Sequence, residues 1–355
     1  MSRFFSNKFA SLKAYVPGEQ PKERKYIKLN TNESPFPPSP SVIDAVTKEA
    51  GSLQLYSDPE CTPLVAEFAK LYGVDSKNVI MTNGSDEVLN FAFMAFCDAE
   101  HPIVFPDITY GFYPVFANLS DIPYEEIPLC DDFSVDYKNY VGIGKNVVIA
   151  NPNAPTGLSL ELWQLEEIVK SNPDNVVIID EAYVDFGGES AYPLIKKYDN
   201  LLVTGTFSKS RSLAGARLGF GIASEAIIID LNTIKYSTNP YNVNRMTMIA
   251  GYRAICDNDY YMDNCKKIIE NREYTKAELK NLGFRVLDSK ANFVFCESEE
   301  IDGNELYLAL KERGILVRHF TLPRIKNFNR ITIGTREEME ALVLEVKNIL
   351  EEKRK

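Results

Sequence analysis

A lysine among small hydroxyl residues is the first candidate for chemistry. Lys209 follows the apolar run LLVTGTF within the stretch TFSKSRSLAGARLGF, and Arg217 comes eight positions later. An amine at the end of a buried strand is partly shielded from water, which lowers its pKa and makes it a nucleophile. Ser208 and Arg217 add a hydroxyl and a guanidinium, and together these groups suit a phosphate. On this stretch alone, a solvated surface lysine is the alternative.

A carboxylate closes a second apolar run. In VVIIDEAYVDF, Asp180 follows four apolar residues, which places it at the sheet edge where parallel strands end. An apolar run followed by Asp-Glu also resembles the magnesium-binding element of nucleotide hydrolases, but that site needs a GxxxxGK[ST] loop, and the sequence has none. A carboxylate here instead suits the protonated ring nitrogen of pyridoxal phosphate. A structural capping Asp is the alternative.

A third stretch, TNGSDEVLNFAF, predicts an anion site. Asn83, Gly84 and Ser85 form a turn, and a helix begins at about Asp86. The unpaired N–H groups and the dipole of a helix start favour a phosphate, although an ordinary capped helix would look the same.

The three stretches together predict one pyridoxal-phosphate site. The Gly84 turn, with Ser208 and Arg217, would hold the cofactor's phosphate. Asp180 would face its ring nitrogen, and Lys209 would reach its aldehyde carbon.

The elements that position these residues alternate along the chain. Short apolar runs end in turn residues and are followed by helical periodicity, which is typical of an α/β protein with a mostly parallel sheet. The runs are NVIMTNG, HPIVFPD, NVVIANP, VVIID, LLVTGTFS and LGFGIAS. Residues 160–170 predict one intervening helix, with Ser159 as its N-cap.

The last hundred residues change in character. FRVLDS, NFVFCES, ILVRHF and RITIGT are short β-runs around the helical ELYLALKERG, which predicts a smaller α+β domain. We therefore expect an N-terminal arm that is part of the small domain over residues 1–30. The large cofactor-binding domain is expected over residues 31–250 and the small C-terminal domain over residues 251–355.

The charge and composition limit the partners. The chain has 39 Lys and Arg against 50 Asp and Glu, so its net charge of −11 argues against a nucleic-acid or membrane-surface protein. The N-terminal stretch has no apolar signal core, and the six cysteines form no CxxC pair, which is expected of a cytoplasmic protein. The two histidines lie far apart without neighbouring cysteines, so no metal site is expected.

Ten motifs in order give the chain a family resemblance. It resembles the histidinol-phosphate aminotransferases, which are fold-type-I pyridoxal-phosphate enzymes, from about Leu29 to Thr335. The motifs are LNTNESPFPPSP, YSDPECTPL, NGSDEVL, FPDITYGFYPVF, NPNAPTG, DEAYVDF, TFSKSRSLAGARLGF, ANFVFC, GILVRHF and RITIGT. The resemblance implies a large domain with a mostly parallel seven-stranded sheet, a smaller α+β domain and pyridoxal 5'-phosphate as cofactor.

The resemblance also implies roles for individual residues. Lys209 is the lysine that bonds the cofactor covalently and moves a proton, Asp180 is the partner of the ring nitrogen, and Tyr183 bonds the phenolic oxygen. Further cofactor contacts are implied at Gly84, Ser85, Asp86, Tyr110, Asn153, Ser208 and Arg217.

The substrate side of the site is implied as well. Arg318 and Arg330 match the arginines that bind the anionic group of small amino-acid or phosphate substrates, since a planar fork suits a carboxylate or a phosphate. Tyr56 matches a tyrosine that the partner subunit contributes, so a homodimer with a shared active site is expected.

One position departs from the family pattern. The asparagine that normally stands directly before PTG and bonds the phenolic oxygen is replaced by Ala154. Either Asn153 takes its place, or Tyr183 and a water molecule act alone.

The expected activity interconverts histidinol phosphate and 2-oxoglutarate with imidazole-acetol phosphate and glutamate, in histidine biosynthesis. A threonine-phosphate decarboxylase and an aromatic aminotransferase are the alternatives with the same cofactor. A ligand-binding module without activity is a third, against which the retained Lys209, Asp180 and Arg217 argue.

Overall fold

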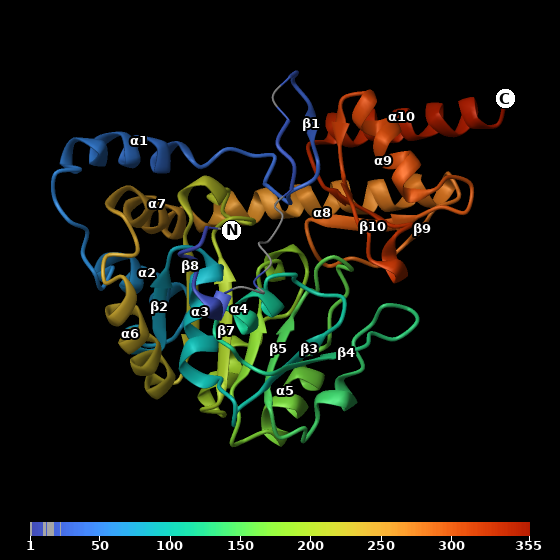
Figure 1. Ribbon diagram of the computed structural model, residues 1–355. Helices are drawn as coiled ribbons and strands as arrows, with labels where there is room; N and C mark the ends of the chain where they lie inside the picture. The colour runs from blue at the N-terminus through green and yellow to red at the C-terminus, as the bar shows by residue number, and fades with distance from the viewer. Residues whose placement is uncertain (1, 10–11, 13–17, 22) are drawn as a thin grey trace.

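The computed structural model describes residues 2–9, 12, 18–21 and 23–355. Its centre is a seven-stranded sheet in the order β2-β8-β7-β6-β5-β3-β4, in which only β8 runs antiparallel to its neighbours (Figure 1). The strands are β2 (Val79–Thr82), β3 (Ile103–Pro106), β4 (Tyr124–Ile127), β5 (Asn146–Ala150), β6 (Val177–Asp180), β7 (Leu201–Thr206) and β8 (Gly219–Ala223). The predicted mostly parallel α/β sheet is confirmed.

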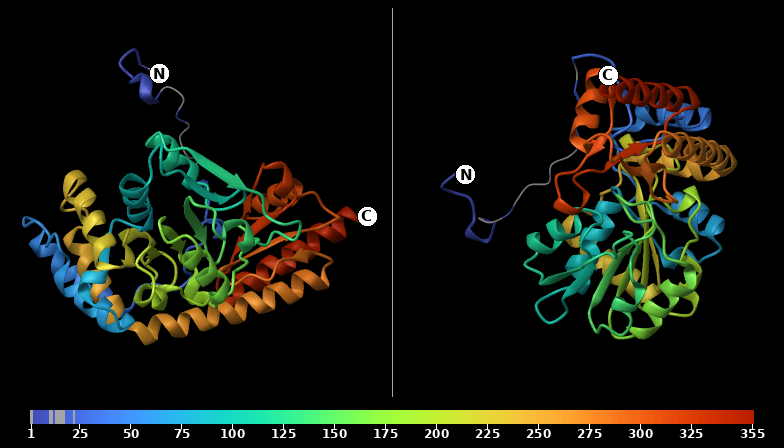
Figure 2. Two further views of the ribbon diagram at one scale, coloured as in Figure 1. Left: turned by 90° about the horizontal axis from the view of Figure 1, so that it is seen from below. Right: turned by 90° about the vertical axis from the view of Figure 1, so that its right-hand side faces the viewer.

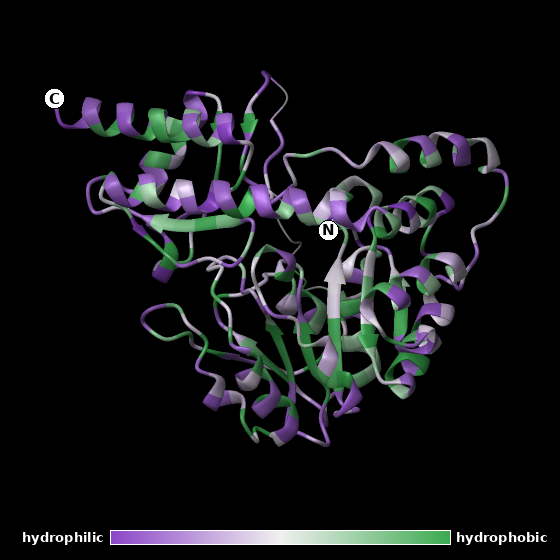
Figure 3. Cartoon of the chain, turned by 180° about the vertical axis from the view of Figure 1, so that it is seen from behind, coloured by the Kyte–Doolittle hydropathy of each residue, from purple (hydrophilic) through white to green (hydrophobic). Residues whose placement is uncertain are grey.

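Helices cover both faces of this sheet, which explains why its central strands β5, β6 and β7 are buried along their whole length and mostly apolar. In β6, Ile178 belongs to a core cluster with residues of α3, α4 and α6, while Val177 and Ile179, on the other face, belong to a cluster with residues of α5. The helices are α1 (Pro40–Glu49), α2 (Thr62–Tyr72), α3 (Ser85–Phe96), α4 (Tyr113–Leu119), α5 (Leu162–Ser171), α6 (Glu225–Thr238) and α7 (Arg245–Cys256). In Figure 3 most of these strands are coloured hydrophobic, whereas the helices alternate between the two colours.

The C-terminal part of the chain forms an antiparallel sheet in the order β12-β13-β10-β9. Its strands are β9 (Arg285–Val286), β10 (Phe293–Glu297), β12 (Arg318–His319) and β13 (Asn329–Thr332). The long helix α8 (Asn258–Asn281) runs from beside α7 to this sheet, where α9 (Gly303–Glu312) and α10 (Arg336–Lys353) also pack (Figures 1 and 2). This is the small α+β part that the sequence predicted.

The N-terminal arm joins the C-terminal part through main-chain pairing. β1 (Ile27–Lys28) lies parallel to β11 (Ile315–Leu316), and the Thr332 N–H donates to the Leu29 carbonyl at 2.9 Å. Part of the predicted arm lies outside the described residues. The domain boundaries at residues 30 and 250 stay predictions.

The start of α5 corrects one detail of the sequence analysis. The N-cap is Glu161 rather than Ser159, and Gln164 completes a reciprocal capping box with it. A glutamate is an uncommon N-cap, and the capping box compensates by pairing both free N–H groups.

Among the described residues, no helix is long and apolar enough to cross a membrane.

The close approach of β8 to the start of α3 makes a stability prediction. A Cβ added at Gly219 would lie 2.2 Å from the Gly84 carbonyl carbon and 2.3 Å from the Ser85 nitrogen. Gly219→Ala should therefore lower the free energy of unfolding by about 1–3 kcal/mol or more, as measured by urea denaturation. Gly215→Ala is the control, because nothing lies within 4 Å of its added Cβ. Equal stability of the two variants would contradict this close approach.

Candidate active site

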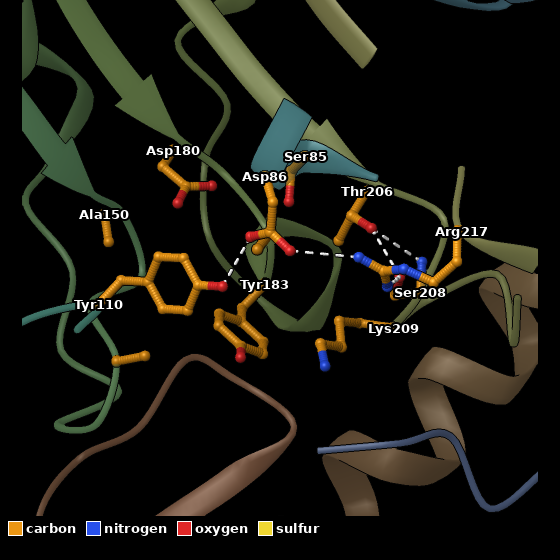
Figure 4. Close-up of a pocket in the computed structure, with 12 residues that line it drawn as sticks. Ser85, Asp86, Tyr110, Ala150, Asp180, Tyr183, Thr206, Ser208, Lys209 and Arg217 are labelled. Carbon is orange, nitrogen blue, oxygen red and sulfur yellow. Dashed lines mark hydrogen bonds and ion pairs between the residues drawn. The ribbon is translucent and has the colours of Figure 1, made fainter. Parts of the chain in front are cut away.

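The pocket at the carboxyl ends of β5, β6 and β7 brings together residues from distant parts of the chain (Figure 4). Lys209 lies in it, three residues after β7, and its Nζ donates to the Thr31 carbonyl at 3.3 Å. The residues that line it are Ser85, Asp86, Tyr110, Ala150, Ala154, Asp180, Ala182, Tyr183, Thr206, Ser208, Lys209 and Arg217.

Asp180 is the last residue of β6 and is 4% exposed. Burial raises the pKa of this carboxyl to about 6. The hydrogen bond that the Tyr113 hydroxyl donates to it at 2.9 Å lowers the pKa, but by less than burial raises it. Burial also raises the pKa of Tyr113 well above its usual value, so that it remains a neutral donor. Within the described residues, no Lys or Arg side chain pairs with Asp180 within 4.0 Å. A protonated heterocycle nitrogen fits such a carboxylate, because a buried anion is stabilised by a cation.

The neighbouring Glu181 points elsewhere. It accepts hydrogen bonds from the Ser190 hydroxyl and the Ala191 N–H, and burial raises its pKa to about 8. The Asp-Glu pair is therefore divided between two environments and does not form a joint metal site.

The turn before α3 and the loop after β7 form a cradle of donors. Gly84 has φ +80°, and an added Cβ there would lie 2.6 Å from Arg217 Nη2. The Arg217 guanidinium contacts Asp86 Oδ2 at 3.2 Å and donates to Ser208 Oγ at 3.4 Å. Since the first N–H groups of α3 have no partner within the helix, this cradle fits a phosphate.

Two tyrosines frame the space between the cradle and Lys209. The Tyr110 hydroxyl donates to Asp86 Oδ1 at 2.7 Å, and the Tyr183 ring centroid lies 5.9 Å from Lys209 Nζ. Tyr183 also accepts a hydrogen bond from Asn32 Nδ2 at 3.0 Å.

The two predicted substrate arginines lie side by side. Arg318 in β12 and Arg330 in β13 are directly opposite in the antiparallel register, so their side chains share one face. They line a second pocket that is continuous with the first, because both pockets include Tyr110, Ala154, Tyr183 and Lys209. Two guanidinium groups opposite one another repel, and an anion between them removes that repulsion.

Asn153 and Tyr56 are not brought into this cluster. Asn153 Nδ2 donates to the Ile108 carbonyl, and its Oδ1 accepts from the Thr109 hydroxyl. Its amide therefore holds the surrounding loop, and Asn153 does not line the pocket. A role of Asn153 in place of the missing asparagine stays a prediction. Tyr56 is 81% exposed and stacks on Tyr241, with ring centroids 4.7 Å apart.

Sequence reasoning missed three residues that the structure places at the site. Tyr113 bonds Asp180, Thr206 donates to Ser208 Oγ at 2.9 Å, and Asn32 bonds Tyr183. Thr206 could have been found, since it precedes Ser208 by two residues. Nothing local distinguishes Tyr113 from a core tyrosine or Asn32 from a turn residue.

The chain is similar to proteins of a known family. Residues 24–346 match the family model described as aminotransferase class I and II. The chain is 54% identical to a histidinol-phosphate aminotransferase of Brachyspira hyodysenteriae, over 99% of each chain. It is 48% identical to one of Clostridium acetobutylicum, over 99% of this chain and 100% of the other.

A solved structure gives the same fold. The histidinol-phosphate aminotransferase of Sinorhizobium meliloti, solved in complex with pyridoxal-5'-phosphate, superposes with a TM-score of 0.88. It is 23% identical and the match covers 99% of both chains.

The raised pKa of Asp180 predicts how the cofactor-free protein responds to pH. The carboxyl ionises near pH 4 in the unfolded chain but only near pH 6 in the folded protein, so stability falls as the pH rises through this interval. Cofactor-free Asp180→Asn should thus be more stable than the unmodified protein at pH 8, by up to about 3 kcal/mol.

Urea unfolding from pH 4 to pH 8 measures this difference, which should shrink as the pH falls below 6. A variant that is less stable at pH 8 would show that the buried carboxylate has a partner that offsets its burial.

Proposed function

The chain belongs to the class I and II aminotransferases, and on that basis we propose that it interconverts histidinol phosphate and 2-oxoglutarate with imidazole-acetol phosphate and glutamate. It is a pyridoxal-phosphate-dependent transaminase. The identity of 54% and 48% to two proteins with this named activity, over nearly the whole chain, supports the substrate. The reaction would serve histidine biosynthesis.

One observation carries the proposal. Lys209, Asp180 and Arg217 line a single pocket, and that pocket continues into the space between Arg318 and Arg330. An amine, a buried carboxylate and a phosphate cradle are the three groups that pyridoxal phosphate needs, and the arginines add an anion site for a substrate.

The residues that would hold the cofactor follow from this arrangement. The phosphate fits the cradle of Gly84, Ser85, Asp86, Ser208 and Arg217. Asp180 would pair with the ring nitrogen, Tyr183 would face the phenolic oxygen, and Tyr110 would lie against the ring.

Bound pyridoxal phosphate supplies an electron sink for negative charge on the substrate's α-carbon. Asp180, kept ionised by the cation it faces, would hold the proton on the ring nitrogen. Lys209 Nζ would act as the base in the pocket. It would take the proton from the α-carbon of the amino substrate and return a proton to the cofactor's former aldehyde carbon.

Arg318 and Arg330 would allow one site to bind two substrates. Glutamate presents a carboxylate and histidinol phosphate presents a phosphate, and a planar guanidinium bonds either group through two N–H donors. Two contacts of Arg330 support this proposal: its Nη2 donates to the Asn30 carbonyl at 3.2 Å, and its guanidinium carbon lies 5.3 Å from the centroid of the Phe293 ring.

We also propose a homodimer whose active sites are shared. Tyr56 is exposed beside Leu53 and Leu55, which are each 57% exposed, and such an apolar segment is typical of a surface that another subunit covers. Tyr56 of the partner would then complete each site. A cytoplasmic location is proposed from the free cysteines.

A substrate assay tests the reaction. With glutamate as amino donor, imidazole-acetol phosphate should be converted far faster than phenylpyruvate, and threonine phosphate should release no carbon dioxide. A preference for phenylpyruvate would favour the aromatic aminotransferase, and carbon dioxide release would favour the decarboxylase.

Lys209→Ala tests the cofactor site itself. The unmodified protein should show a visible absorption band when pyridoxal phosphate is added, and the variant should lack both the band and the activity, because no amine remains to bond the cofactor. Lys290→Ala is the control, since Lys290 is an exposed lysine outside the cofactor pocket. A band of equal strength in Lys209→Ala would contradict the assignment.

Mixing two inactive variants tests the shared site. Lys209→Ala and Tyr56→Ala, dissociated and reassembled in equal amounts, should recover about a quarter of the normal activity, because half of the dimers are hybrids with one intact site. Recovery of no activity would show that Tyr56 acts within its own chain, and an active Tyr56→Ala protein before mixing would show that Tyr56 does not act at the site.

A further inference from the structure

The Tyr183 hydroxyl has a hydrogen-bond partner in the N-terminal arm. Asn32 lies 151 positions before Tyr183, and its Nδ2 donates to the tyrosine oxygen at 3.0 Å. Asn32 is 1% exposed, so this contact is buried. It joins two segments that are far apart in the sequence and meet only in the folded protein.

The orientation of the Asn32 amide is fixed by β13. The Asn32 backbone N–H donates to Thr332 Oγ1 at 2.9 Å, and Thr332 Oγ1 in turn donates to Asn32 Oδ1 at 3.0 Å. The Asn32 carbonyl accepts from Asn292 Nδ2 at 3.0 Å. With its Oδ1 used by Thr332, the amide presents its NH₂ group to Tyr183.

This direction determines where the tyrosine proton goes. A phenolic hydroxyl has one proton and two acceptor positions, and the bond from Asn32 uses an acceptor position. The proton of Tyr183 is therefore left to donate toward another acceptor, and Tyr183 lines the pocket that contains Lys209. Ala154, which also lines this pocket, contributes only a methyl group, and it belongs to a small apolar cluster with Phe293 and Tyr183.

We propose that Asn32 is a positioning residue that makes Tyr183 a hydrogen-bond donor to the phenolic oxygen of the bound cofactor. The inference rests on the proposed function, since it assumes that pyridoxal phosphate occupies this pocket. A donor to that oxygen withdraws negative charge from it and lowers the pKa of the proton that it shares with the Lys209 nitrogen. Asn32 would thus support the hydrogen bond to the phenolic oxygen, which Ala154 cannot make because it has no polar group.

A purely structural role for Asn32 must be distinguished from this one. Its φ is +56°, a conformation that asparagine tolerates better than most residues, and a turn residue would need no contact with Tyr183. Asparagine and aspartate are similar in size and both tolerate this φ, but aspartate has no proton to donate when it is ionised. Asn32→Asp therefore keeps the turn and reverses the hydrogen bond, so that Tyr183 donates to residue 32.

The experiment follows the visible absorption of the pyridoxal-phosphate-loaded protein as a function of pH. Asn32→Asp should raise the pH midpoint of the spectral change by about one unit, the size expected when a hydrogen bond to a charged group is lost. Tyr183→Phe should raise it similarly, and the double variant should show no more than the shift of Tyr183→Phe alone.

Asn30→Asp is the matched control. It adds the same charge two residues away in the same arm, where the Asn30 amide bonds the Glu19 carbonyl and not Tyr183. An equal shift in Asn30→Asp would show that charge alone is responsible, and additive shifts in the double variant would show that Asn32 acts independently of Tyr183. Either result would overturn the proposal, as would an unchanged midpoint in Asn32→Asp.

Asn32→Gly covers the case in which Asn32→Asp does not fold. Glycine adopts a positive φ without strain, and the loss of the amide should raise the midpoint by part of the shift seen for Tyr183→Phe. No shift in this variant would also overturn the proposal. A loaded wild-type protein without any visible band would instead contradict the proposed function.

Discussion

The structure depends on a carboxylate that is buried where the central strands end. Asp180 is 4% exposed, and its described hydrogen bonds come from neutral groups, including the hydroxyls of Tyr113 and Thr204. A buried anion without a cationic partner is unfavourable, which is why burial raises its pKa to about 6. The remaining site residues surround the space where a cation would relieve this cost. The pocket is thus built for a ligand with a positive ring and a negative phosphate.

The second organising feature is the arm around residues 29–32, which connects the two sheets. The Leu29 carbonyl accepts from Thr332, the Asn30 carbonyl accepts from Arg330, and the Thr31 carbonyl accepts from Lys209. Three consecutive residues therefore contact strand β13, which carries Arg330, and the loop that carries Lys209. A movement of this arm would therefore shift the hydrogen-bond partners of both Arg330 and Lys209.

The sequence predicted most of the cofactor pocket because its members lie at the ends of strands. Lys209, Asp180 and the turn at Gly84 each follow an apolar run, and the carboxyl ends of parallel strands meet at one edge. The role of Asn153 stays a prediction, because its amide bonds the loop around it and no local pattern says which of two neighbouring residues faces a pocket. The N-cap of α5 was predicted two residues early, because the stabilising partner of Glu161 is a side chain one turn later.

The sequence by itself determined the fold class, the family and the residue types of the site, since these follow from apolar periodicity and from motifs that are contiguous in the chain. Only the tertiary structure decided which polar groups meet. The contacts of Asn32 with Tyr183, of Tyr113 with Asp180 and of Arg318 with Arg330 depend on strand register and on the path of the arm. Hydrogen bonds act over about 3 Å, and the relative position of segments far apart in sequence is set by packing of the whole core.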